Sequence, residues 1–233
     1  MQSPIASEVS RDTRSVAAWD APVRIFHWTL TLLMVFSVAT ALTGGNAMVW
    51  HMRSGYAILT LVVSRVLWGF VGSTTARFSD FLYGPVPALA FVRDILGRRP
   101  AHYLGHNPVG GWMVLVLLIL ILAQAGTGLF ANDDISTEGP LYRYVSKEFS
   151  DQLTGLHKLN VKILYGLVAL HVAAVLYHLH WRGENLVRAM FTGYKETSAG
   201  EPGNGLRFSS SWLALGLSIA VAVCVYLLVS KPT

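Results

Sequence analysis

The stretch GLHKLNVKILYGLVALHVAAVLYHLHW, residues 155–181, decides how this chain is organised. It is apolar and long enough to cross a bilayer as one helix, because about 20 residues span the hydrocarbon core. It nevertheless carries four histidines, and ionisable side chains inside a spanning helix are costly enough that they usually mark a functional site. His157 and His171 are 14 residues apart, which corresponds to about 21 Å of helix rise and to positions within about 40° of one face. One helix therefore presents two imidazoles in one line, near opposite edges of the membrane.

The composition of the whole chain is that of a membrane protein. Its 233 residues are 53% hydrophobic and only 13% charged, whereas ordinary soluble domains have about 25% charged residues. We attribute the net charge of +5 to membrane topology, because no basic cluster interleaved with aromatic residues indicates nucleic-acid binding. The expected surroundings are membrane lipid, and no nucleic-acid partner is expected.

Long runs of low charge predict five membrane-spanning helices, at about residues 23–43, 49–71, 109–131, 155–181 and 211–229. The predicted fold class is all-α, an integral membrane four-helix bundle with a fifth, C-terminal transmembrane helix. Residues 23–233 form this membrane domain, and residues 1–22 form a polar lead with little regular structure. The lead lacks the short apolar core and the cleavage site of a signal peptide.

The connections between the spanning helices are more polar. Residues 85–96 have the pattern of an amphipathic helix that lies in the membrane interface, and residues 184–191 form a second short amphipathic piece. The acidic loop 132–154 is either a docking surface or a plain solvated loop. His102 and His106, in the connection before the third spanning helix, are interpreted as surface histidines.

Lysine and arginine residues predict the orientation, because cytoplasmic loops of membrane proteins carry an excess of them. The side that holds the N-terminus and the two longest connections has more of these residues than the other side. The chain is therefore predicted to be a multi-pass protein of the bacterial inner (cytoplasmic) membrane, with a cytoplasmic N-terminus. His27 and His171 then share the cytoplasmic level, and His51 and His157 share the periplasmic level.

Two levels of paired histidines indicate two haem groups, one near each membrane face. A haem iron that only transfers electrons suits two neutral imidazoles, because six-coordination leaves no open position for oxygen. The sequence has no C-x-x-C-H motif for covalent attachment, so each haem would be of b type, held by ligands and packing. For each histidine alone, a hydrogen-bonded residue at the membrane interface is the alternative.

Three further polar residues lie near the ends of predicted helices. His178 and His180 lie about 31 and 34 Å along the helix from His157, at or beyond the cytoplasmic surface, and are interpreted as interface residues. A quinone or haem propionate contact is the alternative for them. Arg65 lies about 21 Å along its helix from His51, where it either snorkels to the interface or pairs with a haem propionate.

Five motifs together carry a family resemblance: WDAPVRIFHW (19–28), HMRSGY (51–56), SRVLWGFVGSTTARF (64–78), HNPVGG (106–111) and LHWRGENLVRAMFTGYK (179–195). They resemble the bacterial cytochrome b561 superfamily, and in particular the b-type cytochrome subunit of membrane-bound nickel–iron hydrogenases. The resemblance implies a four-helix core that binds two b haems and exchanges electrons with quinone. Its ligand positions on the first, second and fourth helices match those of His27, His51, His157 and His171. It also implies that Arg24, Arg53, Arg65 and Arg77 lie near haem propionates.

The predicted function is electron transfer in a respiratory chain, by a di-haem b-type membrane cytochrome. It would connect the quinone pool with a periplasmic redox partner, either a c-type cytochrome or a hydrogenase-like protein. The alternative is an enzyme, a superoxide oxidase or ferric reductase acting at the periplasmic haem, where Arg53, Lys158 and Lys162 would attract anions. Whether the chain is itself an enzyme stays open. A third class is a haem-free membrane anchor or transporter subunit.

Overall fold

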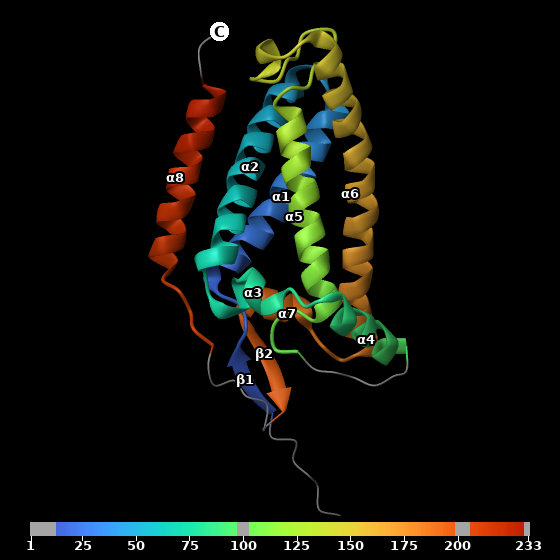
Figure 1. Cartoon of the computed structure of the whole chain (residues 1–233), viewed down its shortest axis with the longest axis vertical. Coiled ribbons are helices and arrows are strands. Elements are labelled where there is room, and N and C mark those ends of the chain that lie inside the picture. Colours follow the sequence, from blue (N-terminus) through green and yellow to red (C-terminus); the bar gives the residue numbers. More distant parts are fainter. Residues whose placement is uncertain (1–12, 97–102, 199–205, 231–233) are drawn as a thin grey trace, which may run out of the picture.

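The computed structural model describes residues 13–96, 103–198 and 206–230, whose helices form a long bundle (Figure 1). The main elements are β1 (Thr13–Ala17), α1 (Ala21–Thr43), α2 (Met48–Val71), α3 (Phe78–Phe81), α4 (Pro85–Leu96), α5 (Pro108–Gly128), α6 (Lys147–Trp181), α7 (Leu186–Thr192), β2 (Tyr194–Ser198) and α8 (Ser211–Val229). The helices α1, α2, α5, α6 and α8 are long and apolar enough to cross a membrane. The predicted fold class, an all-α membrane bundle with a fifth C-terminal helix, is confirmed.

The spanning helices pack in a row that leaves α6 apart from two of its neighbours. The backbone of α1 packs against α2, α2 against α5, and α5 against α6, while α8 packs against the outer side of α2. The backbone of α6 approaches α1 and α2 much less closely than it approaches α5. The backbone of α6, which carries His157 and His171, is therefore separated from α1 and α2, which carry the other predicted ligands.

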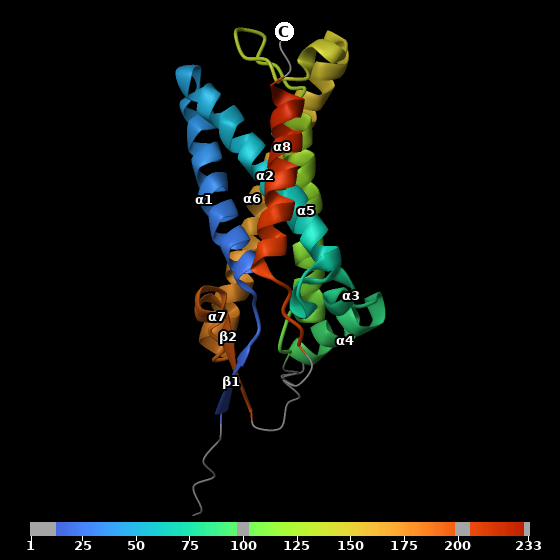
Figure 2. The ribbon, with the colours of Figure 1, turned by 90° about the vertical axis from the view of Figure 1, so that its left-hand side faces the viewer.

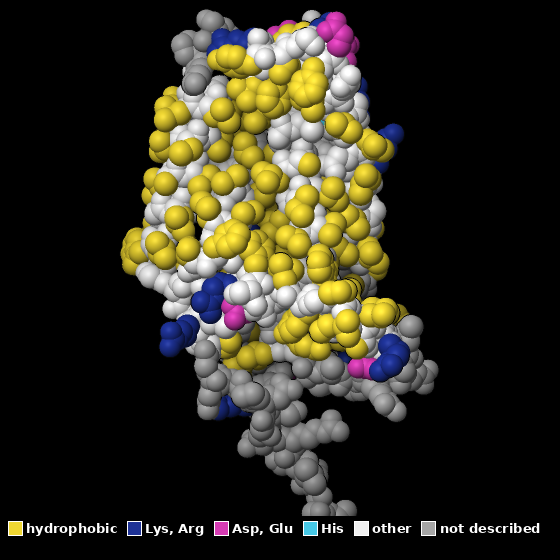
Figure 3. All heavy atoms as spheres, viewed as in Figure 1, with side chains coloured by type: hydrophobic (Ala, Val, Ile, Leu, Met, Phe, Trp, Pro, Cys, Tyr) yellow, Lys and Arg dark blue, Asp and Glu magenta, His cyan; other side chains and the backbone are white. Residues whose placement is uncertain are grey.

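The outer surface of the bundle is apolar over its middle. Figure 3 shows hydrophobic side chains over the central part of the visible face, and most charged side chains toward its two ends. Leu32 and Leu42 of α1 are 70% and 81% exposed. Apolar surface of this extent is typical of a protein whose surroundings are lipid.

One end of the bundle carries a two-stranded ribbon. β1 pairs with β2 in antiparallel register from Thr13↔Ser198 to Ala17↔Tyr194, and α3, α4 and α7 lie at this same end (Figure 2). We call it the ribbon end, and we call the opposite end, which holds residues 129–146, the loop end. The prediction that residues 1–22 have little regular structure is wrong for 13–17, because those residues pair with a strand that is distant in the sequence.

Asp20 fixes the start of α1 and ties it to α2. Its Oδ1 accepts a hydrogen bond from the Val23 N–H at 2.8 Å, and its Oδ2 accepts one from Trp68 Nε1 at 2.9 Å. The side chain thus acts as an N-cap and also satisfies a buried indole donor. α1 begins at Ala21, slightly earlier than predicted, because this cap precedes the apolar run.

The largest difference from the predicted helices is at α6, which begins at Lys147 rather than at Gly155. Ser146 caps this start, since its side chain accepts a hydrogen bond from the Phe149 N–H at 3.3 Å. The added turns are polar, so a search for apolar runs does not find them. They extend the histidine helix into the segment 132–154, which was predicted as a loop.

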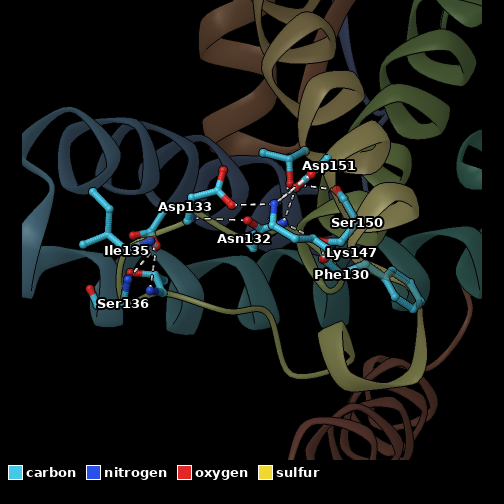
Figure 4. Close-up of polar contacts among 11 residues, drawn as sticks. Phe130, Asn132, Asp133, Ile135, Ser136, Lys147, Ser150 and Asp151 are labelled. Carbon is cyan, nitrogen blue, oxygen red and sulfur yellow. Dashed lines mark hydrogen bonds and ion pairs between the residues drawn. The ribbon is translucent and has the colours of Figure 1, made fainter.

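The loop end is held together by polar contacts between α6 and the segment before it (Figure 4). Ser150 is fully buried, and its Oγ donates to the Phe130 carbonyl at 2.6 Å and accepts from Asn132 Nδ2 at 2.7 Å. Lys147 forms ion pairs with Asp134 at 2.6 Å and with Asp151 at 2.9 Å. This end is therefore a defined surface and not only a solvated connection.

The remaining connections agree with the sequence prediction in outline. The predicted interface helix over 85–96 is observed as α4, which runs across the ribbon end (Figure 1). The amphipathic piece expected at 184–191 is observed as α7, which is about two turns long and shifted toward Thr192. Both cover the end of the bundle at which His27 and His171 lie.

Candidate functional site

The structure brings the four predicted ligands together as two pairs of imidazole rings. The ring centroids of His27 on α1 and His171 on α6 are 6.4 Å apart, with an interplanar angle of 54°. Those of His51 on α2 and His157 on α6 are 6.2 Å apart, with an angle of 85°. The first pair lies toward the ribbon end and the second toward the loop end. The structure thus pairs the same histidines that the predicted depths pair, while their role as haem ligands stays a prediction.

The spacing of both pairs fits a single metal ion between the rings. A metal–imidazole nitrogen bond is about 2 Å long, and each ring centre lies about 1 Å beyond its nitrogen, so two axial imidazoles have centroids about 6 Å apart. Histidines that hydrogen-bond directly to one another would need no such gap. The backbone of α6 also stands apart from that of α1 and α2, so each ring pair joins helices that do not pack closely against one another.

The loop-end pair is oriented by backbone carbonyls. His51 Nδ1 lies 2.9 Å from the carbonyl oxygen of Ser37, and His157 Nδ1 lies 2.9 Å from that of Gln124. A carbonyl oxygen only accepts, so both Nδ1 atoms carry the proton and both Nε2 atoms keep the lone pair that a metal needs. This second contact of a ligand histidine fixes its tautomer and raises its basicity.

The ribbon-end pair lacks this support. His27 Nδ1 is buried and has no hydrogen-bond partner among the described residues. Buried polar atoms are nearly always satisfied, so an exception indicates a partner that the protein chain does not supply. The two pairs therefore share their spacing but differ in what surrounds the rings.

Two of the four predicted propionate arginines have unsatisfied buried donors. Arg24 Nη1 donates to the Phe191 carbonyl at 2.6 Å, but its Nε is buried without a partner within the described chain. Arg65 is only 4% exposed, and its Nη1 is likewise without a partner there. Arg77 pairs with Asp80 at 2.9 Å, and the guanidinium of Arg53 lies 5.0 Å from the ring centre of Trp50. Arg24 and Arg65 thus fit an anionic group at the ribbon end better than the other two arginines do.

The interpretation of His106 as a surface histidine is wrong. Its ring packs between Trp19 and Phe81, with centroid distances of 4.5 and 4.7 Å, and its Nδ1 is buried without a partner in the described part of the chain. Burial, together with the charges of Arg65 and Lys195, lowers the pKa of His106 to about 3. No periodicity marks this residue as partly buried, because it precedes α5 in an irregular segment. His102 lies outside the described residues.

His178 takes part in a polar cluster at the end of α6, as an interface residue would. Its Nδ1 lies 2.8 Å from Glu184 Oε2, and Lys195 Nζ lies 2.6 Å from Glu184 Oε1. Burial alone would raise the pKa of Glu184, but hydrogen bonds from His178 and Lys195 outweigh it and lower the pKa to about 2. His180 is exposed on the same turn, and neither residue joins the two ring pairs.

The low pKa of His106 predicts a loss of stability in acid. The unfolded chain binds a proton near pH 6.5, whereas folded His106 resists it down to about pH 3, so the free energy of unfolding falls as the pH falls through this window. One such group contributes about 1.4 kcal/mol per pH unit. We expect thermal unfolding in detergent to depend less steeply on pH in His106→Gln than in the original chain between pH 6.5 and 4. Equal slopes would show that His106 is accessible to protons in the folded state.

Comparison with known proteins agrees with the resemblance found in the motifs. A sequence model of the family described as prokaryotic cytochrome b561 matches residues 18–193. The chain is 25% identical, over 224 aligned positions, to the probable Ni/Fe-hydrogenase B-type cytochrome subunit of Rhizobium leguminosarum bv. viciae, covering 80% of this chain and 91% of that protein. It is 22% identical to the probable Ni/Fe-hydrogenase 1 B-type cytochrome subunit of Escherichia coli (strain K12), covering 80% of this chain and 93% of that protein. No solved structure matches the chain.

Proposed function

Because the chain belongs to the prokaryotic cytochrome b561 family, we propose that this membrane b-type cytochrome holds two haems and carries electrons between quinone and a partner protein. The observation that supports this most is the distance between the imidazole ring centroids of each pair, 6.4 Å at the ribbon end and 6.2 Å at the loop end. Each distance is close to the separation of about 6 Å expected for two imidazoles that bind one iron. One haem near each membrane face would carry electrons across most of the bilayer.

The residues of the chain have distinct roles in this proposal. When bound, each haem supplies one-electron chemistry between ferric and ferrous iron. His27 with His171, and His51 with His157, would hold the two irons and, as pairs of imidazoles, would leave no open position for oxygen. The Ser37 and Gln124 carbonyls hold the loop-end rings in the tautomer that binds iron. Arg24 offers a buried donor to the anionic edge of the ribbon-end haem.

The proposed orientation places the ribbon end in the cytoplasm and the loop end in the periplasm of the bacterial inner membrane. The excess of lysine and arginine on the ribbon-end side supports it. The partner would then dock on the loop end, where the contacts of Ser150 and Lys147 fix the shape of the surface (Figure 4). The relatives named above are hydrogenase cytochrome subunits, which favours a hydrogenase-like partner over a c-type cytochrome.

An enzymatic function at the loop-end haem is the second candidate. Arg53, Lys158 and Lys162 are exposed on α2 and α6 near that pair, and such a group of cations attracts superoxide or anionic ferric chelates. Electron transfer would then occur at the haem edge, because two histidines would leave no open position on the iron. Both candidate functions need two haems. They differ only in the molecule that exchanges electrons at the loop end, which is a partner protein in the first and a small anion in the second.

A haem count and a quinol titration test the proposal. We expect a pyridine haemochrome assay of the purified protein to give two b haems per chain, and anaerobic addition of a short-chain quinol to reduce them. A count of one or none, or haems that neither quinol reduces nor quinone oxidises, would contradict it. Reduction of the haems by superoxide, with quinone as the acceptor, would favour the second candidate.

A further inference from the structure

A lipid-side pocket lies between α1, α2 and α8, away from the gap that holds the histidines. Its volume is about 200 Å³, and its lining includes Phe26, Leu61, Ser64, Arg65, Ala214 and Ser218. Figure 2 shows α8 across α2, with the ribbon-end part of α1 beside it. α8 lies beyond residues 18–193, which the family model matches, so this pocket depends on a helix that the family resemblance does not describe.

Arg65 gives this apolar pocket a buried hydrogen-bond donor. The residue is 4% exposed, and its Nη1 has no hydrogen-bond partner among the described residues. Asp20 interacts electrostatically with Arg65, but its oxygens hydrogen-bond Val23 N and Trp68 Nε1, and no hydrogen bond joins them to Arg65 Nη1. A charged donor without an acceptor is costly at a buried position. We therefore expect a hydrogen-bond acceptor from a bound molecule to pair with Arg65 Nη1.

We propose that this pocket binds the head group of a membrane quinone, with Arg65 Nη1 donating to one quinone carbonyl. The inference rests on the proposed function and gives it a location. A pocket of about 200 Å³ is smaller than the roughly 300–1,000 Å³ of sites for drug-sized ligands, so it suits one substituted ring. The isoprenoid tail would remain in lipid along Ile25 and Leu215, which are 65% and 48% exposed.

The position of the pocket suits electron exchange with the ribbon-end haem. Phe26 lines the pocket and immediately precedes His27, so both features use the same turn of α1. The chemistry of the lining also separates a quinone from a phospholipid. A phosphate carries a full charge that needs several donors or water, whereas a neutral carbonyl needs only a single donor such as Arg65 Nη1 in a mostly apolar wall.

Photolabelling with a short-chain azido-ubiquinone, in phosphatidylcholine nanodiscs, tests the site. We expect labelled peptides to include residues 211–218 of α8, and excess unlabelled quinone to prevent the labelling. Ala214→Phe fills the pocket, and labelling should fall by about tenfold or more. Ile219→Phe adds the same ring at a 56% exposed position of α8 that does not line the pocket, and labelling should not change. Both variants should keep the haem spectrum of the original chain.

Arg65→Gln removes the proposed donor, and we expect it to weaken labelling of α8 by about tenfold or more. Labelling that survives in this variant while the ribbon-end haem is lost would assign Arg65 to a propionate and overturn the proposal. A phospholipid seen by native mass spectrometry in the original chain but not in Arg65→Gln, with α8 unlabelled, would also overturn it. If quinol reduces the haems but the label lies elsewhere, only the location is wrong. If quinol reduces no haem, the proposed function itself fails.

Discussion

His171→Ala is expected to lower the haem content from two per chain to one, and to remove the haem near the ribbon end. The His171 ring lies 6.4 Å from that of His27, and no other histidine among the described residues of α6 shares this position. Without it, His27 alone would remain to hold the iron. The loop-end pair would keep both rings and both carbonyl contacts. A pyridine haemochrome assay and a low-temperature reduced spectrum measure the loss.

His178→Ala is the matched control for this experiment. It removes a histidine from the same helix, two turns closer to the C-terminal end of α6. The ring of His178 contacts Glu184 and not a second imidazole. This variant should retain both haems, even where the contact with Glu184 contributes to stability. Two haems in His171→Ala, or one haem in His178→Ala, would mean that the ring pairs do not correspond to the iron sites.

The elements that sequence reasoning predicted are those that depend on local pattern. Five apolar runs predict five spanning helices, and a helical rise of 1.5 Å per residue converts positions 157 and 171 into two depths. Charge asymmetry then assigns His27 and His51 to those depths without any knowledge of contacts. The structure places the rings accordingly, since spanning helices confined to one slab have little freedom to shift along their axes.

What the sequence did not predict depends on partners that are distant in the chain. Residues 13–17 have no strand signal of their own, and their pairing with 194–198 forms only because both segments emerge at the ribbon end. His106 is enclosed by Trp19 and Phe81, which come from two separate segments. The polar first turns of α6 are stabilised by the hydrogen bonds of Ser150 with Phe130 and Asn132. In each case the stabilising contact is tertiary, and no periodic pattern signals it.

Arg65 illustrates the same limit for function. Its position in the sequence is equally compatible with snorkelling to the interface and with a propionate contact. The structure shows an arginine that is 4% exposed, which excludes simple snorkelling because that requires the guanidinium to reach water. Only the placement of α8 against α2 reveals an apolar pocket beside it.

His51→Ala is expected to remove the other haem and to separate the two ends of the electron path. His51 faces His157 at 6.2 Å near the loop end, so its loss should leave the ribbon-end haem intact. Quinol should still reduce that remaining haem. Transfer to a partner that docks at the loop end should fall to the background rate, because no iron then lies near that surface. Stopped-flow absorption spectroscopy, with quinol on one side and the oxidised partner on the other, measures both steps.

Ser37→Ala is the control for His51→Ala, because it distinguishes the ligand from its support. His51 Nδ1 contacts both the Ser37 carbonyl at 2.9 Å and the Ser37 hydroxyl at 3.1 Å, and alanine removes only the hydroxyl. The carbonyl alone is sufficient to hold the tautomer, so this variant should keep two haems and both electron-transfer steps. The spectra lost in His51→Ala and in His171→Ala should add up to the spectrum of the original chain. If both variants lose the same spectral component, the two ring pairs do not hold two separate haems, and electrons cannot pass between two haems in this bundle.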